Sequence, residues 1–401
     1  MRKRSISFQK YRGEGLLMNQ KIKVMHVAQA PGGVERYLQC LIKYLDHSKF
    51  ENILVCSYGY KKEKFDEIVD RFEQIEIYRA IGIQDIRAIK MLRKLIRKYN
   101  PDIIYAHSSK AGAVVRIANF GIKNICIYNP HGWAFNMQES KMKQMLYAGI
   151  ERFMAPFCHK IVCISEAERK SALAKKICRT EKLQVIFNGI DVNAYDIRTD
   201  VPTNDNHINM PEDAFVVGMV GRLCLQKAPD IFIQMACQIK QQIPNAYFLI
   251  VGDGELRNRI LKYTEMYRMN DCVYITGWVD NPLDYIKLFH VAVLLSRWEG
   301  FGLVIPEYMI CKKPIVATNI DAIPDIITDY KNGLLVPVND PGSAARAVIE
   351  LQKNTKLQEQ LVLQGFRDVY EKYDAGRVAK QHELLFYSSL KINNSNLCSQ
   401  E

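Results

Sequence analysis

Two short charged segments have a composition that suits a ligand carrying both phosphates and hydroxyl groups. The first follows an apolar run that ends at Val220 and contains Arg222 and Lys227. A guanidinium offers a planar pair of donors and an ammonium a point charge, and together they suit a diphosphate. Taken alone, this spacing is more typical of a solvated basic loop.

The second segment reads SRWEGFGLVIPE over residues 296–307 and also follows an apolar run. Pro306 is tolerated in the first turn of a helix, so Glu307 is expected near a helix start and Glu299 in the loop before it. Carboxylates in these two places suit two parts of one polyhydroxylated ligand. The amides of residues 302–304 are then expected to face its phosphates. Two glycines and a proline argue against the alternative, surface acids around an ordinary turn.

Two further segments carry candidate residues at the ends of apolar runs. Gly33 lies in APGGVER, residues 30–36, where glycine lets the backbone approach a ligand at a helix start. The pattern is not G-x-G-x-x-G, so it does not predict a dinucleotide site. His131, in NPHGW, is a candidate for chemistry, with a turn histidine as the alternative.

These segments must be positioned by a regular alternation of strands and helices. The apolar runs are continuous rather than alternating, as in parallel strands covered on both faces. Helical patterns separate most of them, which predicts doubly wound α/β domains. The predicted strands are 22–28, 53–57, 102–106, 125–128, 160–164, 183–187, 215–220, 247–251, 273–276, 291–295, 314–317 and 333–336.

The length of 401 residues exceeds what one hydrophobic core usually supports, so two domains are expected. A polar, turn-rich break at 198–213 separates two groups of about six strands. The fold class predicted is α/β, with two Rossmann-like domains facing across a cleft. The predicted divisions are an extension (1–20, whose first 17 residues read as a tail or as sequence upstream of the true start), a first domain (21–205), a second domain (206–375) and a terminal helix with a tail (376–401).

Charge is distributed unevenly along the chain. Residues 1–200 hold 35 Lys and Arg against 20 Asp and Glu, a net charge of +15, whereas residues 201–401 carry −3. Such asymmetry indicates an anionic partner, either nucleic acid or an acidic membrane surface. An amphipathic pattern at 141–157 and a basic cluster at 87–98 favour peripheral binding to an anionic membrane. Core-facing helices with solvated outer faces are the alternative, and no nucleic acid is expected because no binding module accompanies the charge.

The motifs as a series resemble the retaining glycosyltransferases of family four, which have the GT-B fold. The resemblance rests on Glu299-x7-Glu307 with Gly-Phe-Gly between, and it extends over most of residues 20–390. It implies transfer of a sugar from a nucleotide-sugar donor, held mainly by the second domain, to an acceptor held mainly by the first. The other matching segments are Gly32-Gly33, His131-Gly132, Asn188-Gly189-Ile190-Asp191, Gly221-Arg222 with Lys227, and Val251-Gly252-Asp253-Gly254.

The resemblance also implies roles for individual residues. Arg222 and Lys227 neutralise the donor diphosphate, Glu307 binds the ribose and Glu299 binds the donor sugar. His131 contacts the sugar near the reacting carbon, the base lies near 277–279, and 188–191 form an interdomain hinge. His131, Arg222, Lys227 and Glu299 are therefore the catalytic candidates. The donor-binding candidates are Gly33, Arg222, Lys227, Val279, Glu299, Phe301, Gly302, Leu303, Val304 and Glu307.

No Asp-x-Asp motif, the usual Mg²⁺–diphosphate ligand of the other main glycosyltransferase fold, occurs in the sequence. We therefore expect catalysis without metal or cofactor, since fixed cations stabilise a leaving diphosphate. Retention is expected by front-face attack, because the sequence offers no clear carboxylate nucleophile for a double displacement. The chain departs from the family pattern at Ala228, where glycine often follows the lysine, and at Lys312-Lys313, which replace small residues.

The expected partners are a nucleotide sugar, with UDP-sugar favoured, and a lipid-linked glycan of capsule or exopolysaccharide assembly. His107 and Lys110 follow another strand end and are candidates for the acceptor side, with a structural cap as the alternative. Scattered cysteines without a C-x-x-C pair indicate a reducing compartment, so the expected location is the cytoplasm, at the inner face of the cell membrane. The alternative functions are a GT-B-fold nucleotide-sugar epimerase and a non-catalytic scaffold subunit.

Overall fold

The computed structural model describes residues 20–78, 82–137, 140–194, 210–279 and 281–398, with side-chain surroundings as far as residue 391. The predicted extension, apart from residue 20, lies outside the described residues. So do residues 198–209 of the predicted polar break.

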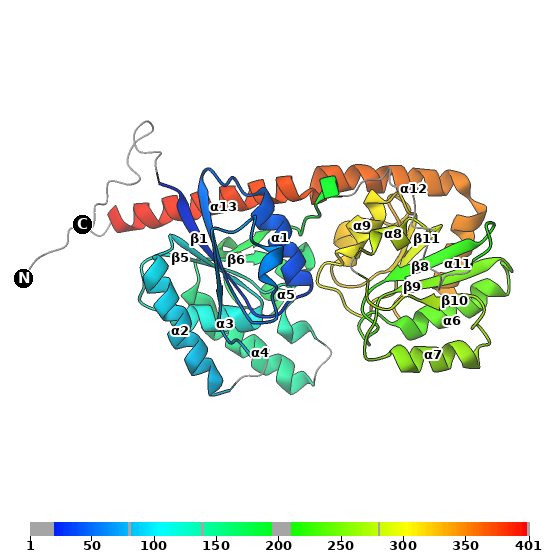
Figure 1. Ribbon diagram of the computed structural model, residues 1–401, viewed down its shortest axis with the longest axis horizontal. Coiled ribbons are helices and arrows are strands. Elements are labelled where there is room, and N and C mark those ends of the chain that lie inside the picture. Colours follow the sequence, from blue (N-terminus) through cyan, green and yellow to red (C-terminus); the bar gives the residue numbers. More distant parts are fainter. Residues whose placement is uncertain (1–19, 79–81, 138–139, 195–209, 280, 399–401) are drawn as a thin grey trace, which may run out of the picture.

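The first half of the described chain forms a parallel sheet of seven strands in the order β3-β2-β1-β4-β5-β6-β7 (Figure 1). Helices α2, α3 and α4 pack on one face of this sheet, and α1 packs on the other. The strands are β1 (Ile22–Ala28), β2 (Phe50–Cys56), β3 (Arg71–Gln74), β4 (Ile103–His107), β5 (Ile125–Asn129), β6 (Lys160–Cys163) and β7 (Leu183–Val185). The helices are α1 (Gly33–Tyr44), α2 (Gln84–Tyr99), α3 (Ser109–Ala118), α4 (Lys141–Met154) and α5 (Glu166–Ala174), with short turns η2 (Lys62–Lys64), η3 (Ala134–Asn136), η4 (Ala155–Phe157), η5 (Thr180–Lys182) and η6 (Val192–Ala194).

The second half forms a parallel sheet of six described strands in the order β10-β9-β8-β11-β12-β13. The strands are β8 (Phe215–Val220), β9 (Ala246–Val251), β10 (Val273–Ile275), β11 (Val291–Leu294), β12 (Ile315–Thr318) and β13 (Leu334–Val336). The helices are α6 (Pro229–Lys240), α7 (Arg257–Met266), α8 (Leu283–Ile286), α9 (Val304–Ile310), α10 (Ile323–Ile326), α11 (Pro341–Lys353), α12 (Thr355–Asp368), the π-helical η7 (Val369–Tyr373) and α13 (Ala375–Cys398). Two Rossmann-like domains, the GT-B arrangement, are therefore confirmed.

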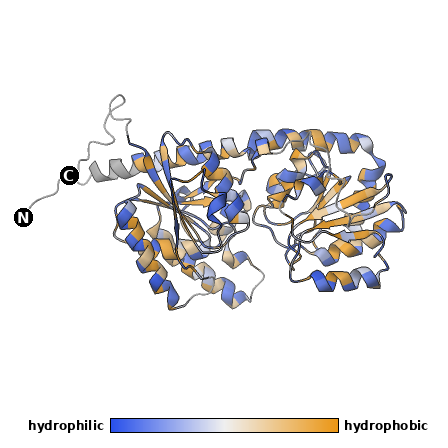
Figure 2. Cartoon of the chain, viewed as in Figure 1, coloured by the Kyte–Doolittle hydropathy of each residue, from blue (hydrophilic) through white to orange (hydrophobic). Residues whose placement is uncertain are grey.

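Apart from one edge strand, the strands form where the sequence is apolar, and the strands of the second sheet stand out as hydrophobic in Figure 2. One strand was not predicted. β3 reads Arg-Phe-Glu-Gln and pairs only with β2 at the sheet edge. An edge strand that is half in water needs no apolar run, so hydropathy does not reveal it.

The terminal helix α13 returns to the first domain although it follows the second in sequence (Figure 1). Val378 and Phe386 of α13 are buried with α1 and the first sheet. At its start, Ile190 and Asp374 form a parallel bridge. The Ile190 N–H donates to the Tyr373 carbonyl oxygen at 2.8 Å, and the Ile190 carbonyl oxygen accepts the Ala375 N–H at 2.9 Å. The two chain segments near the domain junction are thus tied to each other. No described helix is both long enough and apolar enough to cross a bilayer.

Each sheet reverses its strand order once, between β1 and β4 and between β8 and β11. The carboxyl ends of parallel strands at such a reversal border the crevice where open α/β sheets bind ligands. In the first sheet, Gly33 follows β1 and His107 ends β4. In the second, Arg222 follows β8 and Glu299 follows β11. The topology therefore places most predicted site residues at two facing crevices.

Phe386 tests how strongly α13 anchors the first domain. Its ring is buried against Phe50 and Tyr105, at centroid distances of 5.8 and 6.0 Å. F386A is expected to lower the free energy of unfolding, measured with urea, by roughly 3–5 kcal/mol because it leaves a cavity. Leu384, on the same helix but 61% exposed, is the matched control, and L384A is expected to cost about 0.5 kcal/mol or less. Equal losses for both variants would show that α13 is not anchored as described.

Candidate active site

The two charged segments of the second domain meet through an ion pair. Lys227 Nζ lies 2.5 Å from Glu299 Oε2, and both side chains are mostly buried. Ser296 Oγ donates to the same carboxylate oxygen at 3.1 Å, and the Glu299 backbone N–H donates to Asp321 Oδ2 at 3.0 Å. The loops that follow β8 and β11 are therefore joined by a fixed, partly dehydrated charge pair.

Arg222 differs from Lys227 in its surroundings. Its side chain is 65% exposed and contacts Glu255 at 3.1 Å at the rim. An exposed ion pair of this kind contributes little free energy, so its guanidinium is readily redirected to an incoming anion. Of the two residues predicted to bind a diphosphate, Lys227 is thus held in place and Arg222 is able to turn.

Backbone contacts bring the Arg222 loop close to β9. A Cβ atom on Gly252 would lie 2.1 Å from the carbonyl oxygen of Gly221, so only glycine fits there.

Ala228, which departs from the family pattern, has φ 50° and is buried. Glycine adopts this left-handed conformation without the steric cost, roughly 1 kcal/mol, that alanine bears. The departure therefore carries a small cost in stability.

Glu307 lies in the first turn of α9 and is only 2% exposed. Arg36 of α1 reaches it from the first domain, with Nη2 at 2.5 Å from Oε1. Burial raises the pKa of Glu307, and the positive charges of Arg36 and Lys227 oppose this effect. No role was predicted for Arg36, although it follows Gly33 in the same motif.

A cleft of about 430 Å³ opens beside this ion pair, between α1 of the first domain and the loop and helices before Glu307. Its wall includes Arg36, Asn281, Leu283, Leu303 and Glu307. Of the predicted donor-binding residues, Leu303 and Glu307 therefore border the interdomain cleft directly.

The remaining donor-binding candidates lie around the start of α9 and on neighbouring loops. Phe301 is buried, Gly302 has φ 83°, and Val304 begins α9. Val279 is partly buried against the core of the second domain. Gly33 begins α1, and a Cβ atom there would meet nothing within 4 Å. Their contacts with a donor stay predictions.

His131 and Gly132 form a strained loop after β5, with φ values of 51° and 105°. Glu168 holds this loop: its carboxylate accepts the backbone N–H groups of Gly132 at 2.5 Å and Ile164 at 2.8 Å. A Cβ atom on Gly300 would lie 3.6 Å from Gly132 Cα, so the loop meets the Glu299 loop of the second domain. Glu168 was not predicted, although the Ser-x-x-Glu capping box at 165–168 was visible in the sequence.

The two acceptor-side candidates are placed differently from what was predicted. The side chain of His107 is fully buried between His26 and His131, with ring-nitrogen distances of 3.3 and 3.1 Å. It is therefore not available to an acceptor, and that prediction is wrong because β4 ends beneath the His131 loop rather than at the surface. Lys110 Nζ lies 2.5 Å from Asp85 Oδ2, and its predicted role stays a prediction.

The described residues contain no group of three or more His, Cys, Asp or Glu side chains that could hold a metal ion.

Glu168 should give the protein a measurable pH dependence of stability. Burial raises its pKa from 4.5 to about 7, so the folded chain retains a proton that the unfolded chain has released. The contribution of Glu168 to stability therefore falls as the pH rises from 4.5 to about 7. Urea unfolding at about pH 5 and about pH 8 should show wild type losing stability relative to E168Q. Glu166, 41% exposed on the same helix, provides the control E166Q. An unchanged difference between wild type and E168Q would contradict the raised pKa.

Comparison with known families assigns both halves of the chain. Residues 31–194 match the model described as Glycosyltransferase Family 4, and residues 200–368 match that described as Glycosyl transferases group 1. A curated relative from Escherichia coli is named UDP-Gal:alpha-D-GlcNAc-diphosphoundecaprenol alpha-1,3-galactosyltransferase. It is 30% identical over 83% of this chain and 88% of its own length. A second, from Staphylococcus aureus, is named capsular polysaccharide biosynthesis glycosyltransferase CapM and is 24% identical over 87% of this chain and 93% of its own length.

Solved structures agree on the fold. The crystal structure of Anabaena Alr3699/HepE in complex with UDP and glucose superposes with a TM-score of 0.77 at 20% identity, covering 92% of this chain and 100% of that one. The same family is thus indicated by both halves of the chain, by the relative from Escherichia coli and by the architecture. The chain belongs to the family-four, group 1 glycosyltransferases and is a glycosyltransferase with the GT-B fold.

Proposed function

We propose that this glycosyltransferase moves a sugar, with retention, from a UDP-sugar to a lipid-linked glycan during assembly of a cell-surface polysaccharide. The observation that carries the proposal is the Lys227–Glu299 pair at the strand-order reversal of the second sheet, with Glu307 on the adjoining helix. The UDP named in the Anabaena complex and the lipid-linked substrate named for the Escherichia coli relative support the two substrates.

The charges present suit departure of a nucleoside diphosphate. As the bond between the sugar C1 and the phosphate oxygen breaks, negative charge grows on the diphosphate, where Lys227 and Arg222 stabilise it. The acceptor oxygen forms the new bond to C1 on the same face. Its proton passes to the departing phosphate oxygen, so no enzymic base is required. We propose that these two cations do this without a divalent ion.

Glu299 and Glu307 divide the recognition of the donor. Glu299 is fixed by Lys227, Ser296 and its own backbone, so its free lone pairs have a defined direction toward sugar hydroxyls. Glu307 lines the cleft beside Arg36, which supports the proposal that its carboxylate accepts hydrogen bonds from ribose hydroxyls. A carboxylate held in this way orients a bound hydroxyl without a further loss of side-chain entropy on binding.

A lipid-linked acceptor implies contact with a membrane, and α4 presents a suitable surface. The residues of α4 that face the core are Ala148, Glu151 and Met154. The alternative prediction was that the apolar side chains of 141–157 face the core. Most of the large ones are exposed instead. The apolar patch consists of the exposed side chains Ile117, Phe120, Met142, Met145, Leu146, Phe153 and Phe157.

Ring contacts join part of the apolar patch, and positive charge borders it. Phe157 contacts the rings of Phe120 and Phe153 at centroid distances of 5.7 and 6.0 Å. Arg93 of the basic helix α2 donates to the carbonyl oxygens of Ala118 and Phe120, which brings that helix against the patch. An apolar surface with basic borders suits an anionic bilayer, into which the apolar side chains insert. We propose that this surface docks the chain on the inner face of the cell membrane.

Substitution of the donor site tests the proposed reaction. K227A and E307A are each expected to lower transfer from a UDP-sugar roughly 100-fold or more, because each removes a fixed charge from the site. K262A, an exposed lysine on α7, is the control and should keep wild-type turnover. Undiminished turnover in K227A and E307A would overturn the site assignment. Accumulation of an epimerised nucleotide sugar without acceptor would instead identify an epimerase, and loss of activity in EDTA that Mg²⁺ restores would contradict metal independence.

Flotation with liposomes tests the membrane surface. Wild type is expected to float with vesicles of phosphatidylglycerol and phosphatidylcholine but not with phosphatidylcholine alone. The double variant M145S/F153S should lose most of this binding, because it removes two side chains that are 74% and 72% exposed. L261S/M266S, which alters two exposed apolar residues of α7, is the matched control and should float normally. The absence of any preference for anionic vesicles would contradict the membrane proposal.

A further inference from the structure

The turn between Glu299 and the start of α9 is held by one aromatic side chain. Residues 300–302 read Gly-Phe-Gly, so Phe301 supplies the only side chain of this turn. Gly302 has φ 83°, a left-handed conformation that favours glycine, and a glycine has no side chain with which to pack. Phe301 is only 2% exposed, so its ring is packed in the interior. The place where Phe301 packs therefore decides where the turn lies.

Phe301 belongs to an aromatic cluster of three rings, with Phe187 and Tyr373. Its ring centroid lies 6.1 Å from that of Phe187 and 5.9 Å from that of Tyr373, and the latter two lie 5.9 Å apart. Tyr373 meets both partners edge-on, at interplanar angles of 70° and 80°, an arrangement that aromatic pairs prefer. Tyr373 is 1% exposed. Each ring of the cluster thus packs against the other two.

The aromatic cluster lies where the two domains join. The chain leaves the first domain after Phe187 and returns to it through η7, which ends at Tyr373. η7 is π-helical, and short π-helical turns occur frequently at functional positions. The carbonyl oxygen of Tyr373 accepts the Ile190 N–H at 2.8 Å, so the two crossing segments are joined by backbone as well as by rings.

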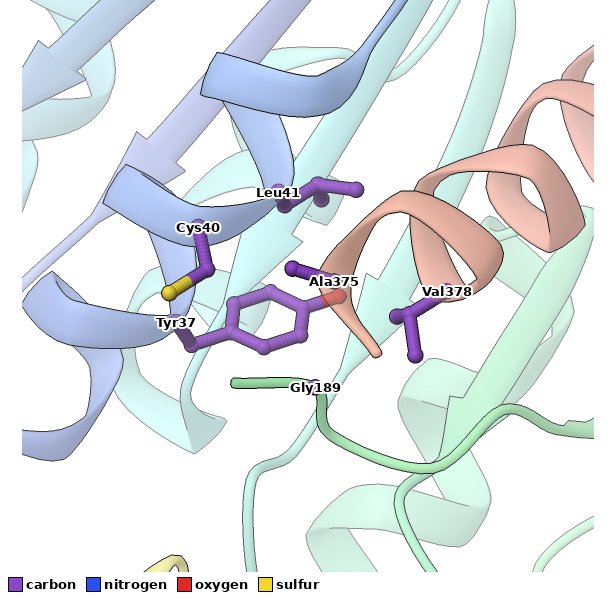
Figure 3. Close-up of a pocket in the computed structure, with 6 residues that line it drawn as sticks. All are labelled: Tyr37, Cys40, Leu41, Gly189, Ala375 and Val378. Atoms are coloured by element: carbon purple, nitrogen blue, oxygen red, sulfur yellow. The ribbon is translucent and has the colours of Figure 1, made fainter. Parts of the chain in front are cut away.

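On the side of the first domain, the crossing segments are closely packed. A Cβ atom on Gly189 would lie 3.0 Å from Ala375 Cα and 3.0 Å from Val378 Cγ2, so the backbone there rests directly on the start of α13. Figure 3 shows Gly189 beside Ala375 and Val378, with Tyr37 and Leu41 of α1 next to them. Close-packed contacts transmit a displacement rather than absorb it. The aromatic cluster is therefore fixed to the first domain.

On the side of the second domain, Phe301 lies between the two parts of the loop that are assigned to the donor. Glu299, paired with Lys227, precedes it by two residues. The carbonyl oxygen of Gly302 accepts the Ile305 N–H at 2.8 Å, which joins the turn directly to α9. A displacement of the Phe301 ring therefore shifts the carboxylate and the start of α9 relative to each other.

We propose that Tyr373 is a positioning residue that holds the loop 299–304 through Phe301, and so ties the donor site to the junction of the two domains. Tyr373 is buried, and its effect on a ligand passes through the ring of Phe301. The assignment of Glu299 and of the amides of 302–304 to the donor belongs to the proposed function, and in that respect the inference rests on it.

Hydrogen–deuterium exchange of the substrate-free protein tests the link without any reaction. The backbone N–H groups of Arg297 and Glu299 are protected by hydrogen bonds of 2.8 and 3.0 Å. Y373A removes the ring that supports Phe301, so these two amides are expected to exchange roughly tenfold faster, because the loop opens more easily. Y373F keeps the ring and should exchange as wild type does.

F232A is the matched control for loss of a buried ring. Phe232 is fully buried, packs on Phe248 at a centroid distance of 6.3 Å and lies on the opposite face of the same sheet. F232A should also lower stability, but it should leave the two loop amides protected as in wild type. Equal acceleration in F232A and Y373A, or unchanged exchange in Y373A, would overturn the proposal. Loss of protection in Y373F would do the same.

Calorimetric titration with UDP tests whether Tyr373 acts through Phe301. A loosened loop must be ordered on binding, so Y373A is expected to bind UDP roughly tenfold more weakly. F301A should show a similar loss, and F301A/Y373A should lose no more than F301A alone, because the two rings act along one path. Additive losses would contradict that path and the proposal with it. Failure of wild type to bind UDP, with the exchange results as expected, would count against the proposed function alone.

Discussion

The Lys227–Glu299 ion pair is the interaction on which the second-domain site depends. Neither charge is well hydrated, so each requires the other, and loss of one would leave the second buried without a partner. The pair joins the loops after β8 and β11, which border the strand-order reversal. These loops are therefore ordered before a ligand arrives. Preorganised charge of this kind stabilises a leaving diphosphate without reorganisation during the reaction.

The site is completed across the domain boundary. Arg36 belongs to the first domain, yet it contacts Glu307 of the second. Any ligand group that binds Glu307 has to share this carboxylate with Arg36, which links occupancy of the cleft to the contact between the domains. The bridge between Ile190 and Asp374 and the packing of α13 on α1 hold the same boundary at its other side. Binding at the cleft and the relative position of the domains are thus physically connected.

The two domains contribute different electrostatics. The second supplies the formal charges of Lys227 and Glu299 at the ends of its strands. The first supplies neutral imidazoles and phenols, because burial strongly disfavours their charged forms. Neutral donors and acceptors suit hydroxyl groups, which both sugar and acceptor carry. The positive charge of the first domain lies instead on its outer helices, such as α2 beside the exposed apolar patch.

The sequence by itself determined the two-domain fold, almost every strand and the family. Buried parallel strands require continuous apolar runs, and the residues directly after those runs necessarily lie at the ligand-binding edge. β3 escaped prediction because an edge strand needs no such run. Only the tertiary structure decided the partners: Arg36 with Glu307, His107 behind His131, Glu168 beneath Gly132, and an outward rather than inward apolar face on α4. These contacts join residues far apart in the chain, and the type of a side chain does not specify which distant group it will meet.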